Sequence, residues 1–211
     1  MGRRIKEPGQ VHREKIASAA ERLFFCHGIE STSMNHIADA AGYSKATLYV
    51  YFANKEDIIG FLVLKSMKTL LSFLQEAVAG SGSSKEKYNR ICLALINYQE
   101  QYPLYFHLAL GEINVDFERE DYLPVEKEIY EVGEQINAEI GTFLRTGICN
   151  GDFKPDIPVE QTAFLFWAAL AGVIQMAENK RIYLKKAMNL SKQQFTRYGV
   201  DLFYKLIAEE E

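Results

Sequence analysis

The 211-residue sequence predicts an all-α protein. Apolar residues recur at three- and four-residue spacing along most of the chain, Ser-x-x-Glu and Ser-x-x-Gln capping motifs open two of these segments, and patterns typical of strands are almost absent. We expect about nine helices, three in a small N-terminal domain and the others in a larger helical domain.

The N-terminal domain begins with an expected helix over residues 13–27, for which Gly28 suits the C-cap. A second, short helix follows Thr32 and Ser33. Gly42 is expected to end it sharply, because glycine readily adopts a positive φ.

A third helix is expected directly after that turn. The Ser44 side chain can cap it by accepting hydrogen bonds from free N–H groups of the first turn. Leu48 and Phe52 lie four residues apart and would face inward against the second helix. The outward-facing residues are then Lys45, Ala46, Thr47, Tyr49, Val50 and Tyr51.

The remaining helices are delimited by caps, prolines and turn residues. Asn54 and Asp57 open a long helix to about Ala79, and Ser83 and Glu86 form a capping box after a Gly/Ser-rich break. The other expected helices cover residues 104–115, 124–150, 159–179 and a final segment from Ser191 through Leu206, with an acidic connection at 116–121 and a turn-rich link at 151–158.

Composition indicates an ordinary globular protein of the cytoplasm. No run of about 18 apolar residues predicts a membrane span, and the polar N-terminus lacks the apolar core of a signal peptide. The three cysteines are far apart, which favours reduced thiols over disulfides or a zinc site. Residues 1–55 carry a net charge of +3 and the remainder −7, so the basic end lies in the small domain, where a nucleic-acid partner would find local positive charge.

An enzymatic function finds little support in the sequence. It contains no phosphate-binding glycine loop, no Gly-x-Ser-x-Gly and no His-Glu-x-x-His motif, and its four histidines lack metal-ligand spacing. We therefore expect no catalytic residues, no metal and no cofactor.

The ordered set of features at the N-terminal end of the chain resembles the TetR/AcrR family of bacterial transcriptional regulators. The features are Ala19 to Gly28, Thr32-Ser33, Ile37-Ala38, Gly42, Thr47-Leu-Tyr49, Phe52 and Asn54-Lys-Glu56. The resemblance implies a helix-turn-helix DNA-binding domain over residues 1–56, preceded by a basic arm at 1–11, and an effector-binding and dimerisation domain over 57–211. It also implies a homodimer whose two recognition helices enter successive major grooves of a palindromic operator.

The resemblance implies roles for residues that match the family pattern. Phosphate contacts are expected from Thr32, Ser33, Lys55, Tyr49 and Tyr51, with His36 near the DNA face. Either tyrosine could instead pack against the first helix. Basic residues Arg3, Arg4 and Lys6 of the arm would follow the minor groove or form a loose tail.

Base edges are expected to meet Ser44, Lys45, Ala46, Thr47 and Val50. Lys45 can donate to guanine, and the methyl groups of Ala46 or Val50 can touch thymine. Relatives often carry an aromatic residue or histidine at the position of Val50, so operator sequence cannot be transferred from them.

The last two expected helices resemble a dimerisation pair. Small and apolar residues would form a four-helix bundle across a two-fold axis, although intramolecular packing could use the same residues. The interface residues are Ala168, Ala169, Gly172, Phe195, Gly199, Leu202, Phe203 and Leu206.

The same domain in this family usually holds an effector pocket. Aromatic residues are the candidates to line it, although at helical spacing they also suit a plain core, and His107 also suits a core or rim position. The candidates are Phe61, Phe73, Tyr98, Tyr102, Tyr105, Phe106, His107, Phe143, Phe164 and Trp167.

Two functions therefore follow from the sequence. The first is a repressor that a small apolar or aromatic effector releases from its operator; activation in place of repression is also open. The alternative is a DNA-bound structural or cell-cycle protein with the same fold and no effector.

Overall fold

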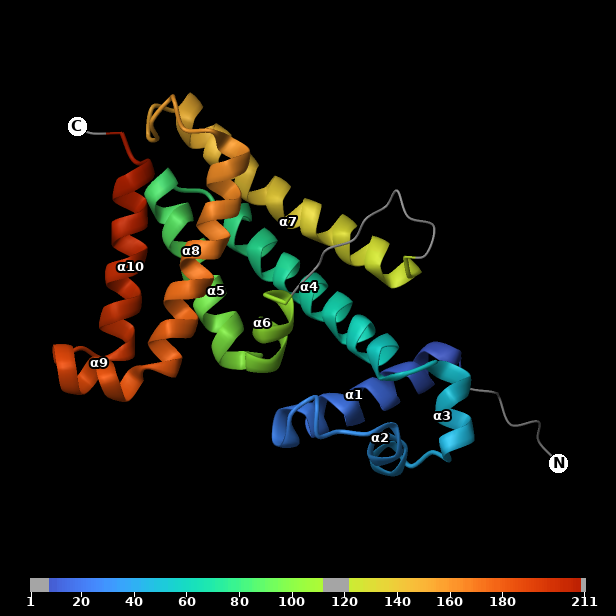
Figure 1. Ribbon diagram of the computed structural model, residues 1–211. Helices are drawn as coiled ribbons and strands as arrows, with labels where there is room; N and C mark the ends of the chain where they lie inside the picture. The colour runs from blue at the N-terminus through green and yellow to red at the C-terminus, as the bar shows by residue number, and fades with distance from the viewer. Residues whose placement is uncertain (1–7, 112–121, 210–211) are drawn as a thin grey trace. The chain divides into compact units, whose positions relative to one another are not determined.

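A computed structural model describes residues 8–111 and 122–209, and these residues form ten α-helices (Figure 1). The all-α prediction is confirmed. In the described part of the chain, the one β-type contact is an isolated antiparallel bridge between Phe153 and Ala208. The helices are α1 (Gly9–His27), α2 (Met34–Ala41), α3 (Lys45–Tyr51), α4 (Lys55–Ala79), α5 (Ser84–Gln101), α6 (Pro103–Ala109), α7 (Pro124–Cys149), α8 (Val159–Asn179), α9 (Arg181–Met188) and α10 (Lys192–Ile207).

Contacts within the chain divide it into two compact units. The first unit contains described residues within Met1–Met67 and Leu104–Ile129, and the second contains those within Lys68–Pro103 and Tyr130–Glu211. α4 and α7 each contribute residues to both units. The domain boundary expected after residue 56 stays a prediction.

The first unit is built on α1, which contacts both α2 and α3. Ile16 and Ala20 of α1 are fully buried, as are Ile37 of α2 and Leu48 of α3. These apolar residues form the small core that holds the three helices together.

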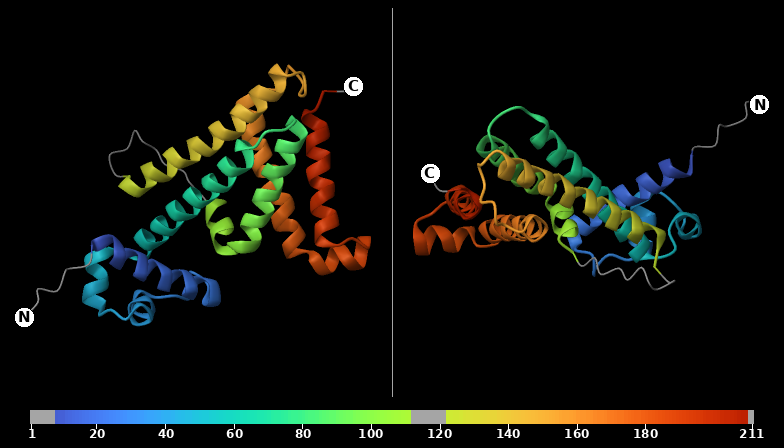
Figure 2. Two further views of the ribbon diagram at one scale, coloured as in Figure 1. Left: turned by 180° about the vertical axis from the view of Figure 1, so that it is seen from behind. Right: turned by 90° about the horizontal axis from the view of Figure 1, so that it is seen from above.

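The second unit is organised by the packing of α8 against α10, which lie side by side in Figure 2. Phe166 of α8 and Phe203 of α10 make an edge-to-face contact with ring centroids 5.5 Å apart. Tyr88 of α5 is fully buried and donates its hydroxyl to Val200 O at 2.6 Å, so α5 is tied to α10.

Two ion pairs made by Lys192, here called the charged clamp, join the end of α8 to the start of α10. Lys192 Nζ lies 2.6 Å from Glu178 Oε2 and 3.2 Å from Glu100 Oε1. The hydrogen bond from Lys192 lowers the pKa of the Glu178 carboxyl. The clamp therefore links α5, α8 and α10 at one end of the unit.

The predicted caps are confirmed. Ser44 Oγ accepts the Thr47 N–H, and Gly42 ends α2 with φ of 73°. Capping boxes at Ser83 and Ser191 open α5 and α10, since each serine hydroxyl accepts the N–H of the third helical residue.

Three helices differ from the prediction. α1 begins at Gly9, earlier than expected, and α6 ends at Ala109. α9 was not expected; three of its eight residues are basic, and Leu184 is its one buried residue. The acidic connection at 116–121, and residues 112–115 of the helix expected to precede it, lie outside the described residues.

By length and composition alone, the most apolar 18-residue stretch of α8 could cross a membrane. Core helices of soluble proteins meet the same criterion. Only 28% of that stretch of α8 is buried within the single chain, so α8 exposes an apolar face at the surface of the chain.

Candidate nucleic-acid interface

α2 and α3 form a helix-turn-helix in which each helix has its own N-cap. Ser33 Oγ accepts the His36 N–H at 3.3 Å, and the Ser33 N–H donates to His36 Nδ1 at 3.4 Å. Gly42 then takes the left-handed backbone conformation that lets the chain turn tightly into α3. This turn allows α3 to begin at Lys45, capped by Ser44.

α3 has a buried inner face and an exposed outer face. Leu48 and the following Phe52 are buried, as the sequence predicts. On the outer face, Val50 is 76% exposed and Tyr49 is 44% exposed. The remaining base-contact candidates are Lys45 and Ala46, which are exposed, and Thr47, which is half-buried with its hydroxyl 2.8 Å from Ser44 Oγ.

Three residues expected at phosphates have structural partners within the chain. Thr32 is 2% exposed, and its hydroxyl donates to Gly28 O at 2.8 Å. The half-buried Lys55 donates to Ile29 O at 3.0 Å. The ring of Tyr51 stacks on His12, so it packs against the first helix, the alternative that the sequence left open.

The remaining phosphate candidates lie at the surface. Ser33 and His36 are exposed at the first turn of α2, where backbone N–H groups lack intrahelical partners. The arm residues Arg3, Arg4 and Lys6 lie outside the described residues.

Sequence reasoning missed the residues that hold α3 in place. His12 and Arg13 on α1 contact Tyr43, Tyr51 and Phe52 around α3. No motif marks them, because the contacts join positions that lie far apart in the sequence.

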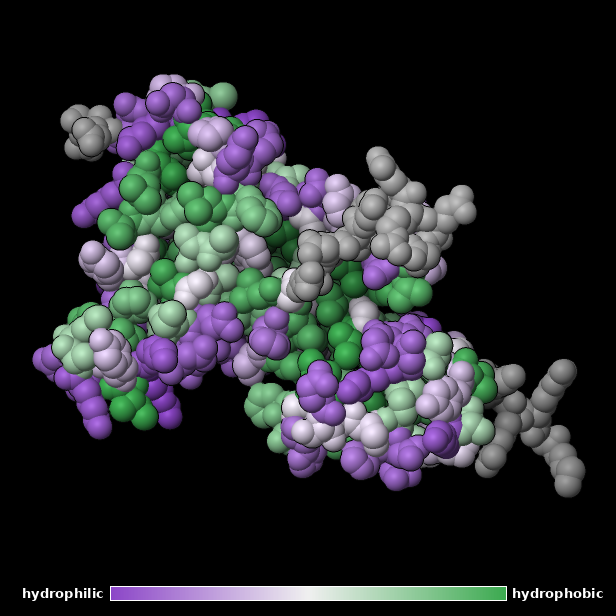
Figure 3. Space-filling view, viewed as in Figure 1, coloured by the Kyte–Doolittle hydropathy of each residue, from purple (hydrophilic) through white to green (hydrophobic). Residues whose placement is uncertain are grey.

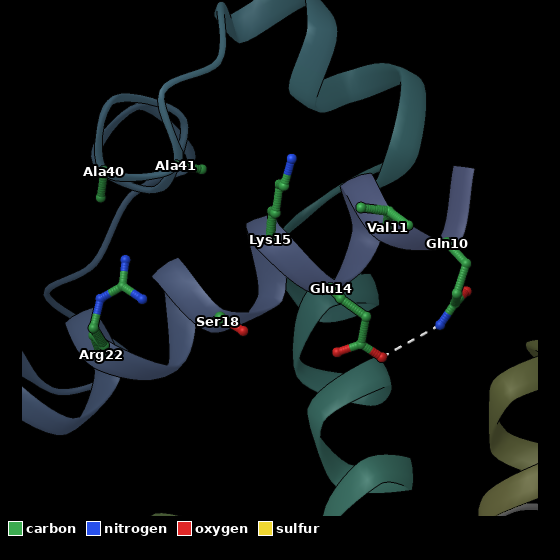
Figure 4. Close-up of a pocket in the computed structure, with 8 residues that line it drawn as sticks. All are labelled: Gln10, Val11, Glu14, Lys15, Ser18, Arg22, Ala40 and Ala41. Carbon is green, nitrogen blue, oxygen red and sulfur yellow. Dashed lines mark hydrogen bonds between the residues drawn. The ribbon is translucent and has the colours of Figure 1, made fainter. Parts of the chain in front are cut away.

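A shallow groove of about 510 Å³ lies along α1 beside the C-terminal end of α2 (Figure 4). The exposed Lys15 and Arg22 rise from α1 toward α2 there. Their seven-residue spacing places both on one face of α1, a signal that the sequence contains. The groove adds positive charge to the helix-turn-helix unit.

Part of the predicted effector set gathers in one cluster of the second unit. The ring of Phe73 on α4 lies 5.6 Å from Tyr98 and 6.1 Å from Tyr102, at the C-terminal end of α5. Tyr98 is fully buried, while Tyr102 is 37% exposed. These three rings form a connected aromatic cluster.

Other members of the predicted set lie elsewhere. Phe61 packs on Phe52 behind α3, and Phe143 packs on Phe153. Phe61 and Phe143 therefore pack outside the aromatic cluster. Phe164 is 64% exposed on α8. The remaining members are the buried Tyr105 and Phe106, the exposed His107 and the half-buried Trp167.

The residues expected at a dimer interface divide between a surface and the core. Apolar residues gather over α8 and α10 in Figure 3. The exposed members of the set are Leu202, Leu206, Ala168 and Gly172, which lie on the same two helices as the exposed Phe164 and Leu165. Ala169 and Phe195 are half-buried.

Phe203 and Gly199 serve packing within the chain. Phe203 contacts Phe166 and is buried. A Cβ atom on Gly199 would lie 2.7 Å from Val173 Cγ1 of α8. These contacts favour the intramolecular packing that the sequence left open for the two residues, and a role at a dimer interface stays a prediction.

The described residues contain no group of three or more His, Cys, Asp or Glu side chains placed to hold a metal ion. An exposed helix of a helix-turn-helix, within the segment 1–55 that carries a net charge of +3, is the arrangement of a DNA-binding transcriptional regulator.

Comparison with known proteins agrees. Residues 16–60 match the model of the bacterial regulatory proteins of the tetR family. The chain belongs to the TetR family. It is 26% identical over 156 residues to an uncharacterised HTH-type transcriptional regulator, YhgD of Bacillus subtilis, covering 74% of this chain and 78% of YhgD.

One further relative and one solved structure each share most of their length with the chain. The fatty acid metabolism regulator protein of Bacillus subtilis is 27% identical over 150 residues, which cover 69% of this chain and 72% of that protein. The structure of the fatty acid degradation regulator FadR from Bacillus halodurans aligns with a TM-score of 0.70 and 19% identity, covering 95% of this chain and 97% of FadR. This last likeness shows the fold.

Proposed function

We propose that the protein is a repressor that binds a palindromic operator as a homodimer and is released by a small, largely apolar or aromatic effector. The observation that carries the proposal is the outer face of α3, where exposed residues stand on a helix anchored by Leu48 and Phe52. An exposed face on a fixed short helix suits insertion into the major groove.

Base readout is assigned to the outer face and first turn of α3. Lys45 can donate to guanine O6 and N7, and Val50 and Ala46 offer apolar contacts to thymine methyl groups. Ser44 and Thr47 share a hydrogen bond and can each also contact a base edge.

Phosphate contacts are assigned to both helices of the motif. Ser33 and His36 lie at the N-terminus of α2, where free N–H groups favour an anion. Tyr49 and Lys55 are assigned to phosphates as well; the Lys55 ammonium uses one donor on Ile29 O and keeps two for phosphate. Thr32 and Tyr51 already have partners within the chain, so we assign them to holding the helices in place and not to direct contact with phosphate.

Dimerisation is assigned to the exposed apolar face of α8 and α10, where Gly172, Leu202 and Leu206 are open to a partner. A single chain leaves this face in water, and burying it against a second copy would remove a large apolar area from solvent.

The effector is assigned to the aromatic cluster of Phe73, Tyr98 and Tyr102. α5, which carries Tyr98, also carries the buried Gln99, whose Oε1 has no hydrogen-bond donor among the described residues. A ligand donor would satisfy that oxygen. Because one relative is named as a regulator of fatty acid metabolism, fatty acids and their acyl derivatives are the first effectors to test.

Release follows from linkage. An effector lowers DNA affinity only by the free energy with which it prefers the conformation that does not bind DNA, and a coupling of about 1–3 kcal/mol changes affinity roughly 5- to 150-fold. The protein would act in the cytoplasm, with DNA and effector as its partners and no catalytic role.

The test is selection of sheared genomic DNA on the purified protein at near-physiological salt, followed by sequencing. A few palindromic sites would support a specific repressor; retention of many unrelated sequences would favour the effector-independent structural protein. Saturating acyl compounds that bind the protein without changing operator affinity would refute the switch.

Two substitutions separate the assigned roles. Lys45→Ala should change the preference among operator variants, whereas Lys55→Ala should weaken binding to all sequences and lower the salt slope by about one. Equal effects of both on specific and random DNA would refute the assignment of Lys45.

A further inference from the structure

Both ends of α3 are tied to the beginning of α1 by one side chain. His12 Nδ1 lies 2.6 Å from the hydroxyl oxygen of Tyr43, in the turn before α3. The same imidazole stacks on Tyr51, the last residue of α3, with ring centroids 5.0 Å apart and planes at 28°. His12 therefore bridges the two flanks of the recognition helix.

Arg13, the next residue of α1, supports the C-terminal end of α3. Its Nη1 donates to Tyr51 O at 3.0 Å, and its guanidinium lies 4.3 Å from the ring centroid of Phe52. It also lies 3.6 Å from Asp57 Oδ1 at the start of α4. The carbonyl of Tyr51 is one of the terminal carbonyls that lack an intrahelical donor, so this contact satisfies it.

α3 needs such external ties because it has only seven residues. Helices of this length are unstable alone and depend on tertiary packing. Leu48 and Phe52 anchor the inner face, but a helix held along one line of side chains can still tilt and rotate about that line. Contacts at Tyr43 and Tyr51 lie at the two ends, where they oppose such motion most effectively.

We propose that His12 is a positioning residue for DNA recognition: acting through Tyr43 and Tyr51, it sets the orientation of α3 and hence the register of Lys45 and Val50 in the major groove. This inference rests on the proposed function. His12 itself touches no base; it acts through the two tyrosines.

The expected signature is a loss of sequence discrimination. Hydrogen bonds to base edges weaken steeply when distance or angle departs from the optimum, whereas charge attraction to phosphates falls slowly with distance. A misoriented α3 therefore loses specific binding and keeps most of its non-specific binding.

The test compares two duplexes: one that the wild-type protein selects from a randomised pool, and a random-sequence duplex of the same length. His12→Phe keeps a ring to stack on Tyr51 and removes the nitrogen that bonds Tyr43. Loss of one neutral hydrogen bond should lower affinity for the selected duplex about three- to tenfold and for the random duplex less than twofold.

Tyr43→Phe removes the same bond from its other end and should give the same loss. The double variant should lose no more than either single variant, since one interaction is removed in all three. His27→Phe, an identical change at the exposed C-terminal end of α1, is the matched control and should change neither affinity.

Each variant is titrated for its DNA-active fraction, so that misfolded protein is not counted as weak binding. An unchanged ratio of the two affinities in His12→Phe and Tyr43→Phe would overturn the inference, as would equal losses on both duplexes. If the wild-type protein selects no sequence, the proposed function fails, and this inference with it.

Discussion

Substitutions at Gly199 and Gly172 test which face of α8 and α10 packs within the chain and which is open to a partner. The same change to alanine should affect the free energy of unfolding differently at the two positions. A Cβ atom at Gly199 would lie 2.7 and 2.9 Å from the two methyl carbons of Val173 on α8. At Gly172 a Cβ atom would meet nothing within 4 Å in the same chain.

The magnitude follows from these distances. Carbon atoms in good contact lie about 3.5–4.0 Å apart, so Gly199→Ala requires α8 and α10 to separate by roughly 1 Å or Val173 to change rotamer. Overpacking of this kind costs about 1–3 kcal/mol, and the better helix propensity of alanine offsets about 1 kcal/mol of it. The net loss in free energy of unfolding should be up to about 2 kcal/mol, whereas Gly172→Ala, whose added methyl group meets nothing in its own chain, should raise the free energy of unfolding of the single chain by up to about 1 kcal/mol.

The assay is urea unfolding of both variants at one protein concentration, because the stability of a dimer depends on concentration. Equal m-values would show that the same surface unfolds in each case. A Gly199→Ala protein at least as stable as Gly172→Ala would refute the assignment of Gly199 to intramolecular packing.

Two further substitutions and two measurements on Cys92 test other features. Gly172→Leu should shift the protein toward monomer in sedimentation velocity and weaken operator binding; a dimer that binds operator normally would show that the interface lies elsewhere. Gln99→Leu replaces a buried acceptor without a described donor and should leave stability unchanged or raise it by about 1 kcal/mol, measured by urea unfolding, while a loss above about 1 kcal/mol would show that the oxygen is satisfied. Burial raises the pKa of the Cys92 thiol to about 12, so at pH 8 a maleimide should label the exposed Cys26 and Cys149 and spare Cys92 in the native protein. The Cys92 thiol of the unfolded chain ionises near pH 8.5, well below the pKa of the native thiol. Cys92 should therefore lower the free energy of unfolding as the pH rises from about 8.5 to 12. A free energy of unfolding that does not change across this pH range would contradict the burial of Cys92.

Local sequence was enough to place most helices and their ends. Ser44, Ser83 and Ser191 cap helices because a side-chain oxygen and the N–H of the third following residue are close in any helix start. α9 was not predicted: its apolar residues Ile182, Tyr183 and Met188 are exposed, and only Leu184 is buried.

The candidate site was predictable only where exposure follows from helical periodicity. Leu48 turns inward and Val50 outward because positions two apart point to nearly opposite sides of a helix. Thr32 and Tyr51 could not be placed this way, because their partners, Gly28 O and His12, were known only after the loops and α1 had been folded together.

The sequence by itself determined the all-α class, the helix-turn-helix and its family, since these depend on spacing and caps within short stretches of the chain. Only the tertiary structure decided which small and aromatic residues are used inside the chain: Gly199 and Phe203 against α8, Phe61 behind α3, and His12 across the two ends of α3. The reason is physical, because the role of a side chain depends on what packs against it, and those partners lie far away in sequence.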